Sequence, residues 1–241
     1  KRVDQILGNW GQFEPVMTHP AGEEASVEFR FRNGSKVSFE AHEINVPQLL
    51  ADVKNYLKSN PRELNWEKMN IGDIGWMIVQ KDQDKYVGKQ VADWSEKLEP
   101  RPMHFDRRVT IKTPLKKAGA YMLAATMQDG NTSKIIIWID DTVIVKKQLD
   151  EKAYFFVADA LTGEPLPKMN LEFFGYRQEG VKWEKMIGRH YNVLTTVFAE
   201  LTDENGQVIP NPKDFKSDYQ WVITATSPST GSGQAPDNRF A

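Results

Sequence analysis

The stretch that decides the fold is AYFFVADALTGEPLPKMNLEFF, residues 153–174. An apolar, aromatic run over 153–158 stops at the turn-forming residues 162–165 and resumes over 171–174. Runs of this kind, punctuated by Gly and Pro, predict strands joined by turns. Working outward, the same pattern predicts strands over 193–201 and 219–226, with a turn at Asp203-Glu204-Asn205-Gly206. Short strands with such turns predict an antiparallel β-sandwich.

The first half of the chain carries the same signal. Val27, Phe29 and Phe31 alternate with charged residues, Asn33-Gly34 follows, and Val37, Phe39 and Ala41 resume the alternation. Because Asn-Gly supplies the two positive-φ residues of a tight turn, this stretch predicts a β-hairpin. Residues 1–26 are polar and broken by Gly and Pro, and they are interpreted as an irregular entry segment. Further strands are predicted over 109–111, 121–125, 134–139 and 143–145.

One segment has a different period. Val46, Leu49, Leu50, Val53 and Leu57 fall on one stripe of an α-helix over 46–58. Pro47 suits the first helical turn and Asn60-Pro61 ends the helix. We expect this helix to pack on the first domain as an insertion around 46–68, with a second short helix near 61–68.

The polar connector over 146–152 (KKQLDEK) separates two sets of predicted strands. It therefore predicts two tandem β-sandwich domains, residues 1–148 with the helical insertion and residues 149–241. Asn238-Arg239-Phe240-Ala241 looks like the start of another strand, so we expect the second domain to be truncated at its C-terminus.

Composition excludes several classes of function. The formal charge is −2 and no run of Lys or Arg is longer than two residues, which argues against nucleic acid as a partner. The chain has no Cys, so it has no disulfide, no thiolate metal site and no Cys nucleophile. Its longest strictly apolar run, 135–139, is far shorter than the ~20 residues that a membrane helix needs.

Candidate chemistry is sparse. No two of His19, His42, His104 and His190 have the spacing of a metal pair. The adjacent carboxylates Asp140-Asp141 would point to opposite faces of a strand, so a charged strand break explains them better than a cation site.

Three further motifs have structural explanations. Residues 203–206 resemble half of a calcium loop without its later ligands. Residues 227–233 (SPSTGSG) lack the Lys of a phosphate cradle. Asn33-Gly34-Ser35 and Asn131-Thr132-Ser133 match glycosylation acceptors that turns explain equally well. We therefore predict no catalytic, cofactor-binding or metal-binding residues, no cofactor and no enzyme activity.

Several strands resemble one family. Residues 118–125 (AGAYMLAA) resemble the strand that closes a macroglobulin-like domain, and residues 136–145 (IIWIDDTVIV) resemble the strand leading out of it. Residues 154–171 are similar to the opening of the next such domain, and 198–206 to its T-D-x-x-G turn. Together they resemble the N-terminal macroglobulin-like domains of bacterial alpha-2-macroglobulin-like proteins. Residues 23–45 match more loosely, 46–100 match weakly, and Met169-Asn170 stand where the family prefers small residues.

The resemblance implies a fold and a function. The fold would be tandem macroglobulin-like sandwiches of the immunoglobulin or fibronectin type. The function would be structural, as scaffold domains of a protease-trapping endopeptidase inhibitor. The thioester of such inhibitors needs a Cys, which this chain lacks. The implied partners are neighbouring domains of a longer chain, with proteases as targets of the full-length protein. The implied location is extracytoplasmic: periplasmic, cell-envelope or secreted.

One alternative remains open, an extracytoplasmic adhesin-like or carbohydrate-binding sandwich. An exposed coplanar pair of Trp or Tyr side chains in one groove would favour that alternative, because such rings stack on sugars. Burial of all seven Trp side chains would favour the scaffold.

Overall fold

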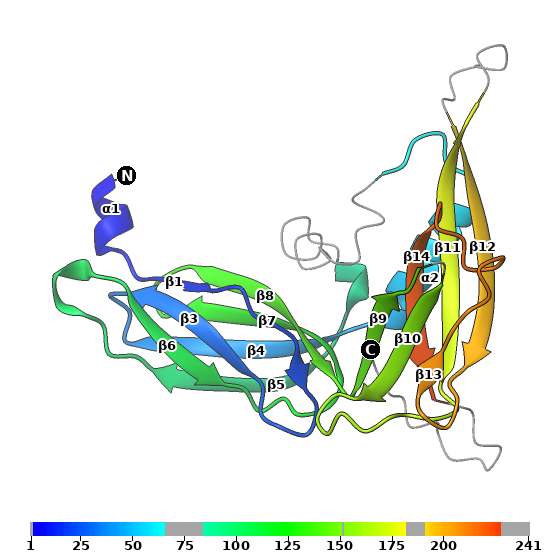
Figure 1. The fold of residues 1–241 in the computed structure, drawn as a ribbon. Coiled ribbons are helices and arrows are strands. Elements are labelled where there is room, and N and C mark those ends of the chain that lie inside the picture. The colour runs from blue at the N-terminus through cyan, green and yellow to red at the C-terminus, as the bar shows by residue number, and fades with distance from the viewer. Residues whose placement is uncertain (1, 66–83, 151, 182–190, 228–241) are drawn as a thin grey trace. The chain divides into compact units, whose positions relative to one another are not determined.

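The computed structural model describes residues 2–65, 84–150, 152–181 and 191–227 (Figure 1). Its contacts divide the chain into two compact units. The first consists of Lys1–Val46 with Ile71–Ile139, and the second of Pro47–Asn70 with Asp140–Ala241. The mostly β fold class and the tandem sandwiches predicted from the sequence are confirmed.

The first unit is a sandwich of two sheets. One has the order β1-β3-β6: β1 (Trp10–Phe13), β3 (Ser26–Arg32) and β6 (Arg107–Lys112). The other has the order β2-β8-β7-β4-β5: β2 (His19–Pro20), β8 (Thr132–Asp140), β7 (Gly119–Met127), β4 (Lys36–Ile44) and β5 (Val87–Lys97). The shorter elements are α1 (Arg2–Leu7), η2 (Asp84–Tyr86) and η3 (Pro102–His104).

Alternating side chains from both sheets fill one core. The sheet β1-β3-β6 contributes Phe13, Val27, Phe29, Phe31 and Ile111, and the facing sheet contributes Val37, Phe39, Leu123, Met127 and Ile137. The rings of Phe29 and Phe39 meet edge to face with centroids 5.8 Å apart, which joins the two layers at their centre.

The predicted hairpin at Asn33-Gly34 is wrong. Strands β3 and β4 are consecutive in the chain but belong to opposite sheets, so the chain crosses between layers at this turn. Asn33 has a φ of 64°, but Gly34 is not in the positive-φ region, whereas a type I′ hairpin turn needs both. Gly34 serves a different purpose, because a Cβ there would collide with the Met127 side chain.

The entry segment is also more regular than predicted. Strand β1 pairs with β3 over Trp10–Phe13, and Phe13 lies in the core with 6% exposure. Gly11 occupies an inward-facing position of β1 without an apolar side chain, so the alternation that predicts a strand is not visible in the sequence.

The second unit is a sandwich as well. One sheet has the order β13-β10-β9: β13 (Gln207–Val208), β10 (Ala153–Asp159) and β9 (Thr142–Gln148). The other has the order β12-β11-β14: β12 (Tyr191–Leu201), β11 (Asn170–Gly180) and β14 (Gln220–Thr226). The shared core contains Phe155, Val157, Leu171, Phe173 and Val208.

The helix α2 (Val46–Lys58) forms where the sequence predicts it, and Val46, Leu49, Val53 and Leu57 are buried while Leu50 is half-buried. The prediction that it packs on the first domain is wrong. Lys54 forms an ion pair with Glu172 of β11, and the ammonium groups of Lys54 and Lys58 each lie 5.8 Å from the Phe174 ring centroid. The helix therefore packs on the second unit.

The predicted connector 146–152 is a hairpin rather than a linker. Strand β9 pairs with β10 from Thr142↔Asp159 to Gln148↔Ala153, and the turn is closed by the Leu149 N–H donating to Lys152 O at 2.7 Å. The contact-based division at Ile139/Asp140 thus differs from the predicted domain limits at 148/149. Lys146, Lys147 and Gln148 are polar because β9 is the outer strand of its sheet and these side chains are exposed.

Two predictions fall largely or wholly outside the described residues. The second short helix is absent from 61–65, and its remainder over 66–68 is not among the described residues. The proposed strand start at 238–241 also lies outside them.

Candidate functional site

The histidines are scattered. His19 lies in β2, His42 lies 3.7 Å from the Glu40 carboxylate on β4, and the Nδ1 atom of His104 lies 2.8 Å from the Asn33 amide oxygen. His190 is outside the described residues. Over the described ranges, no group of three or more His, Asp or Glu side chains converges in a way that could hold a metal ion.

Asp140 and Asp141 lie at the end of β8 and directly before β9. The Asp141 carboxylate accepts a hydrogen bond from the Thr142 hydroxyl at 2.9 Å. Burial, and secondarily the neighbouring charge of Asp141, raises the pKa of Asp140 to about 6. Asp140 and Asp141 therefore lie where one strand ends and the next begins, as the interpretation of a charged strand break predicted.

The calcium-like segment 203–206 is a turn. Its Asp203 carboxylate accepts hydrogen bonds from the N–H groups of Asn205 and Gln207, both at 2.8 Å, and Gly206 has a φ of 71°. Both bonds are accepted by Oδ1 of Asp203 and hold the backbone in the turn, as the sequence pattern predicted. Of the segment 227–233, only Ser227 is described.

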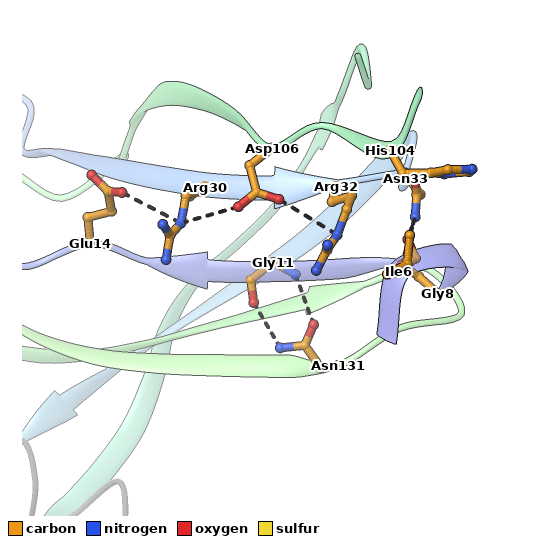
Figure 2. A network of polar contacts seen from close by, with 10 residues as sticks. All are labelled: Ile6, Gly8, Gly11, Glu14, Arg30, Arg32, Asn33, His104, Asp106 and Asn131. Atoms are coloured by element: carbon orange, nitrogen blue, oxygen red, sulfur yellow. Dashed lines mark hydrogen bonds and ion pairs between the residues drawn. The ribbon is translucent and has the colours of Figure 1, made fainter. Parts of the chain in front are cut away.

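Both glycosylation-like asparagines hold backbone together (Figure 2). The Asn131 amide accepts from Gly11 N–H at 2.9 Å and donates to Gly11 O at 2.8 Å, as a neighbouring strand would. The Asn33 amide donates to Ile6 O at 2.8 Å and Gly8 O at 3.0 Å, which ties α1 to the β3–β4 crossing. The side-chain amides of Asn33 and Asn131 thus form hydrogen bonds to backbone groups of the same unit.

Charged side chains line the outer face of the sheet β1-β3-β6. Arg30 lies between the carboxylates of Glu14 and Asp106, at 3.8 and 3.9 Å, and Arg32 lies 3.6 Å from Asp106 (Figure 2). Both guanidinium groups lie over the Trp10 ring, at 5.4 and 5.6 Å from its centroid. Arg108 also contacts the Glu14 carboxylate, at 2.8 Å, so two carboxylates pair with three guanidinium groups on this face.

A pocket of about 260 Å³ lies at one side of the second unit, where β9 and β14 approach each other. Phe215, Tyr219 and Trp221 supply its rings, and Lys146, Lys152 and Lys216 supply its charges. The sequence pattern did not indicate this pocket, because Lys146 and Lys152 were assigned to the connector over 146–152. The sequence did contain one signal, the closely spaced aromatic residues Phe215, Tyr219 and Trp221. They lie close to Lys146 only once the two sheets have packed together.

The four tryptophans in the described ranges are Trp10, Trp94, Trp138 and Trp221, and all four are half-buried. In the pocket, Trp221 stacks on Phe215 with centroids 4.7 Å apart. These two rings therefore face each other. The Tyr–Trp pair of the same pocket, Tyr219 and Trp221, has ring centroids 5.8 Å apart and planes inclined by 34°, so it does not form a coplanar platform either. The feature that would favour a sugar-binding module is not present in the described residues.

No protein-family model matches the sequence, and no curated protein matches it. Solved structures do match. A crystal structure of native alpha-2-macroglobulin from Escherichia coli spanning the domains NIE and MG1 aligns with a TM-score of 0.52 and 12% identity, covering 92% of this chain and 94% of that one. The chain has the fold of bacterial alpha-2-macroglobulin domains.

Two larger macroglobulin structures also align. The E. coli fragment spanning MG0, NIE and MG1 gives a TM-score of 0.47 at 11% identity, covering 89% of this chain and 64% of that one. The native conformation of E. coli alpha-2-macroglobulin gives 0.40 at 11% identity, covering 90% of this chain and 12% of that one. The chain thus spans nearly all of the NIE-MG1 fragment and about an eighth of the larger macroglobulin chain.

The α-helices in the described ranges of this macroglobulin-like chain, α1 and α2, have 6 and 13 residues. None of those in the described ranges has the length and apolar character that a membrane crossing requires.

Proposed function

We propose that this chain provides scaffold domains of a bacterial alpha-2-macroglobulin-like protease-trapping inhibitor. The observation that carries the proposal is the alignment with the NIE-MG1 fragment, which covers 92% of this chain and 94% of that fragment.

The chemistry of the chain supports a structural role. The sequence has no Cys, so a thioester that captures a protease would have to lie in another part of the inhibitor. The histidines are far apart in the sequence, and the Asp140-Asp141 pair serves a strand break. We therefore propose that this chain is not an enzyme and that its partners are neighbouring domains of a longer protein. Proteases would be the targets of that whole protein, outside the cytoplasm.

Trapping has a distinctive kinetic signature that tests the proposal. A protease enclosed by its inhibitor still cleaves small chromogenic peptides but no longer cleaves a large protein substrate. We expect the whole protein that contains this sequence to produce that split with elastase or trypsin. We expect the 241-residue chain alone to change neither rate.

Two results would contradict the proposal. One is stoichiometric inhibition of both substrates by the 241-residue chain, which would make it a direct inhibitor. The other is that a protease still cleaves the protein substrate at its normal rate when the whole protein is present in excess. The whole protein would then not be a protease trap, and this chain could not be part of one.

A further inference from the structure

The pocket between β9 and β14 differs in charge from the chain as a whole. Lys146, Lys152 and Lys216 line it, and no Asp or Glu is among the described residues of its lining. None of these three lysines forms an ion pair with a described carboxylate. In a chain with a net charge of −2, this local positive potential favours an anionic occupant.

The aromatic floor of the pocket is held in place. The indole N–H of Trp221 donates to Lys216 O at 3.0 Å, and its ring stacks on Phe215. Lys146 extends over the other ring of this stack, with its ammonium 5.3 Å from the Phe215 centroid. Apolar surface and positive charge are therefore presented together in this pocket.

The outer strand β9 forms one wall. In the described part of the chain it pairs only with β10, and β14 is likewise the outer strand of its sheet. An outer strand has backbone N–H and C=O groups pointing away from its neighbour, and an extended peptide pairs with such groups. Lys146 and Gln148 of this strand line the pocket, so a peptide on the edge would place alternate side chains there.

These features fit a peptide better than a sugar. One face of the Trp221 ring is covered by Phe215 and the indole N–H is used, so one stacking face and one donor are not available to a sugar. The buried Pro210 and the exposed Pro212 add apolar wall, Ser217 and Tyr219 add hydroxyl groups, and the open edge of β9 beside them offers the backbone groups with which an extended peptide pairs. A volume of about 260 Å³ accommodates one or two side chains.

We propose that this pocket binds an extended acidic segment of a partner protein, with an apolar side chain on the Phe215–Trp221 floor and flanking carboxylates on the three lysines. The proposal goes beyond protease trapping and does not depend on it, since it concerns a surface of the second unit alone.

The test uses fluorescein-labelled nonapeptides and the 241-residue chain, with fluorescence anisotropy as the readout. A peptide of alternating Glu and Val should bind, and the matched peptides of alternating Lys and Val or Gln and Val should bind at least about tenfold more weakly. Added salt should weaken the binding of the Glu/Val peptide, because exposed charges are screened.

Charge reversal locates the site. Lys146→Glu combined with Lys216→Glu should weaken binding of the Glu/Val peptide at least about tenfold. Lys112→Glu combined with Lys117→Glu, which changes the net charge equally on exposed lysines of the first unit, should leave it unchanged. Both lysines of the test pair are exposed, and equal thermal melts of the two variants will show that the fold persists.

Three outcomes would overturn the proposal. They are no binding of the Glu/Val peptide at millimolar concentration, equal binding by both charge-reversed variants, and displacement of the peptide by a uronic acid oligosaccharide that binds more tightly. The last result would assign the pocket to an acidic sugar instead. Failure of trapping by the whole protein would leave these binding measurements unaffected, so the two proposals can fail separately.

Discussion

Phe173 and Phe174 are neighbours on strand β11, and both are buried although their side chains leave the strand on opposite faces. Phe173 faces the sandwich core, where its ring meets Phe155 with centroids 5.2 Å apart. Phe174 lies on the face that carries Lys54 and Lys58 of α2. The helix therefore covers the outer face of the sheet β12-β11-β14, and the second unit has three layers.

This arrangement predicts which unit depends on the helix. Leu57→Ala removes a side chain with 0% exposure and should lower the free energy of unfolding by about 2–4 kcal/mol. Hydrogen exchange measured by mass spectrometry should show the loss of protection in α2 and β11, with β4 and β7 unchanged.

The matched control is Asn55→Ala, which changes an exposed position of the same helix and should alter stability by no more than about 0.5 kcal/mol. Loss of protection in β4 and β7 instead of β11 would show that α2 belongs to the first unit, as the sequence pattern alone suggested.

A second prediction concerns the close packing of β1. A Cβ at Gly11 would lie 2.8 Å from Cε1 of Phe29 and 2.9 Å from the Met127 sulfur, both deep in the core. Gly11→Ala should therefore destabilise the protein by about 1–3 kcal/mol through overpacking, as measured by urea unfolding. The neighbouring Gln12→Ala, at an exposed position, provides the comparison and should have little effect. Equal midpoints for the two variants would refute the packing argument.

Asn131 carries a third prediction, because its amide substitutes for a strand next to Gly11. Asn131→Ala removes both hydrogen bonds and should cost about 1–2 kcal/mol, and Asn131→Asp should cost at least as much, because it keeps the acceptor for Gly11 N–H but sets a carboxylate oxygen against Gly11 O. Thermal melts will rank the three proteins, with Gln128→Ala at an exposed site of the same turn as the control. If the alanine variant melts with the parent protein, the two bonds add nothing to stability.

The sequence predicted the strands well because burial alternates along them, but it could not assign a strand to a sheet. Val27, Phe29 and Phe31 on β3 and Val37, Phe39 and Ala41 on β4 point into one core, whether the strands are paired or face each other. The dipeptide Asn33-Gly34 is typical of a hairpin turn and therefore favoured the pairing of β3 with β4. The deciding contact, Gly34 against Met127, joins residues far apart in the sequence and leaves no local pattern.

The packing partner of the helix and the pocket were missed for related reasons. The apolar stripe of α2 shows which side is buried but not what covers it. The signal for its partner was the adjacent pair Phe173-Phe174, which requires a sheet covered on both faces. The pocket joins Lys146 to Trp221 through the packing of two sheets, so its residues come together only when the topology is known.

The last prediction concerns pH and Asp140. Its pKa is raised from 3.8 to about 6, mainly by burial, so the folded protein holds this proton more tightly than the unfolded chain does. Above pH ~6 the charged carboxylate lowers the free energy of unfolding, and this penalty shrinks as the pH falls towards 4 and is absent below that. The full shift corresponds to about 3 kcal/mol, which partial exposure reduces to about 1–2 kcal/mol.

Asp140→Asn should therefore stabilise the protein at pH 7 and lose that advantage at pH 4, measured by urea unfolding at both values. Asp150→Asn removes the same charge from an exposed position of the β9–β10 hairpin and should give no such gain. A stabilisation by Asp140→Asn that is equal at pH 7 and pH 4 would show that the gain does not come from the buried charge.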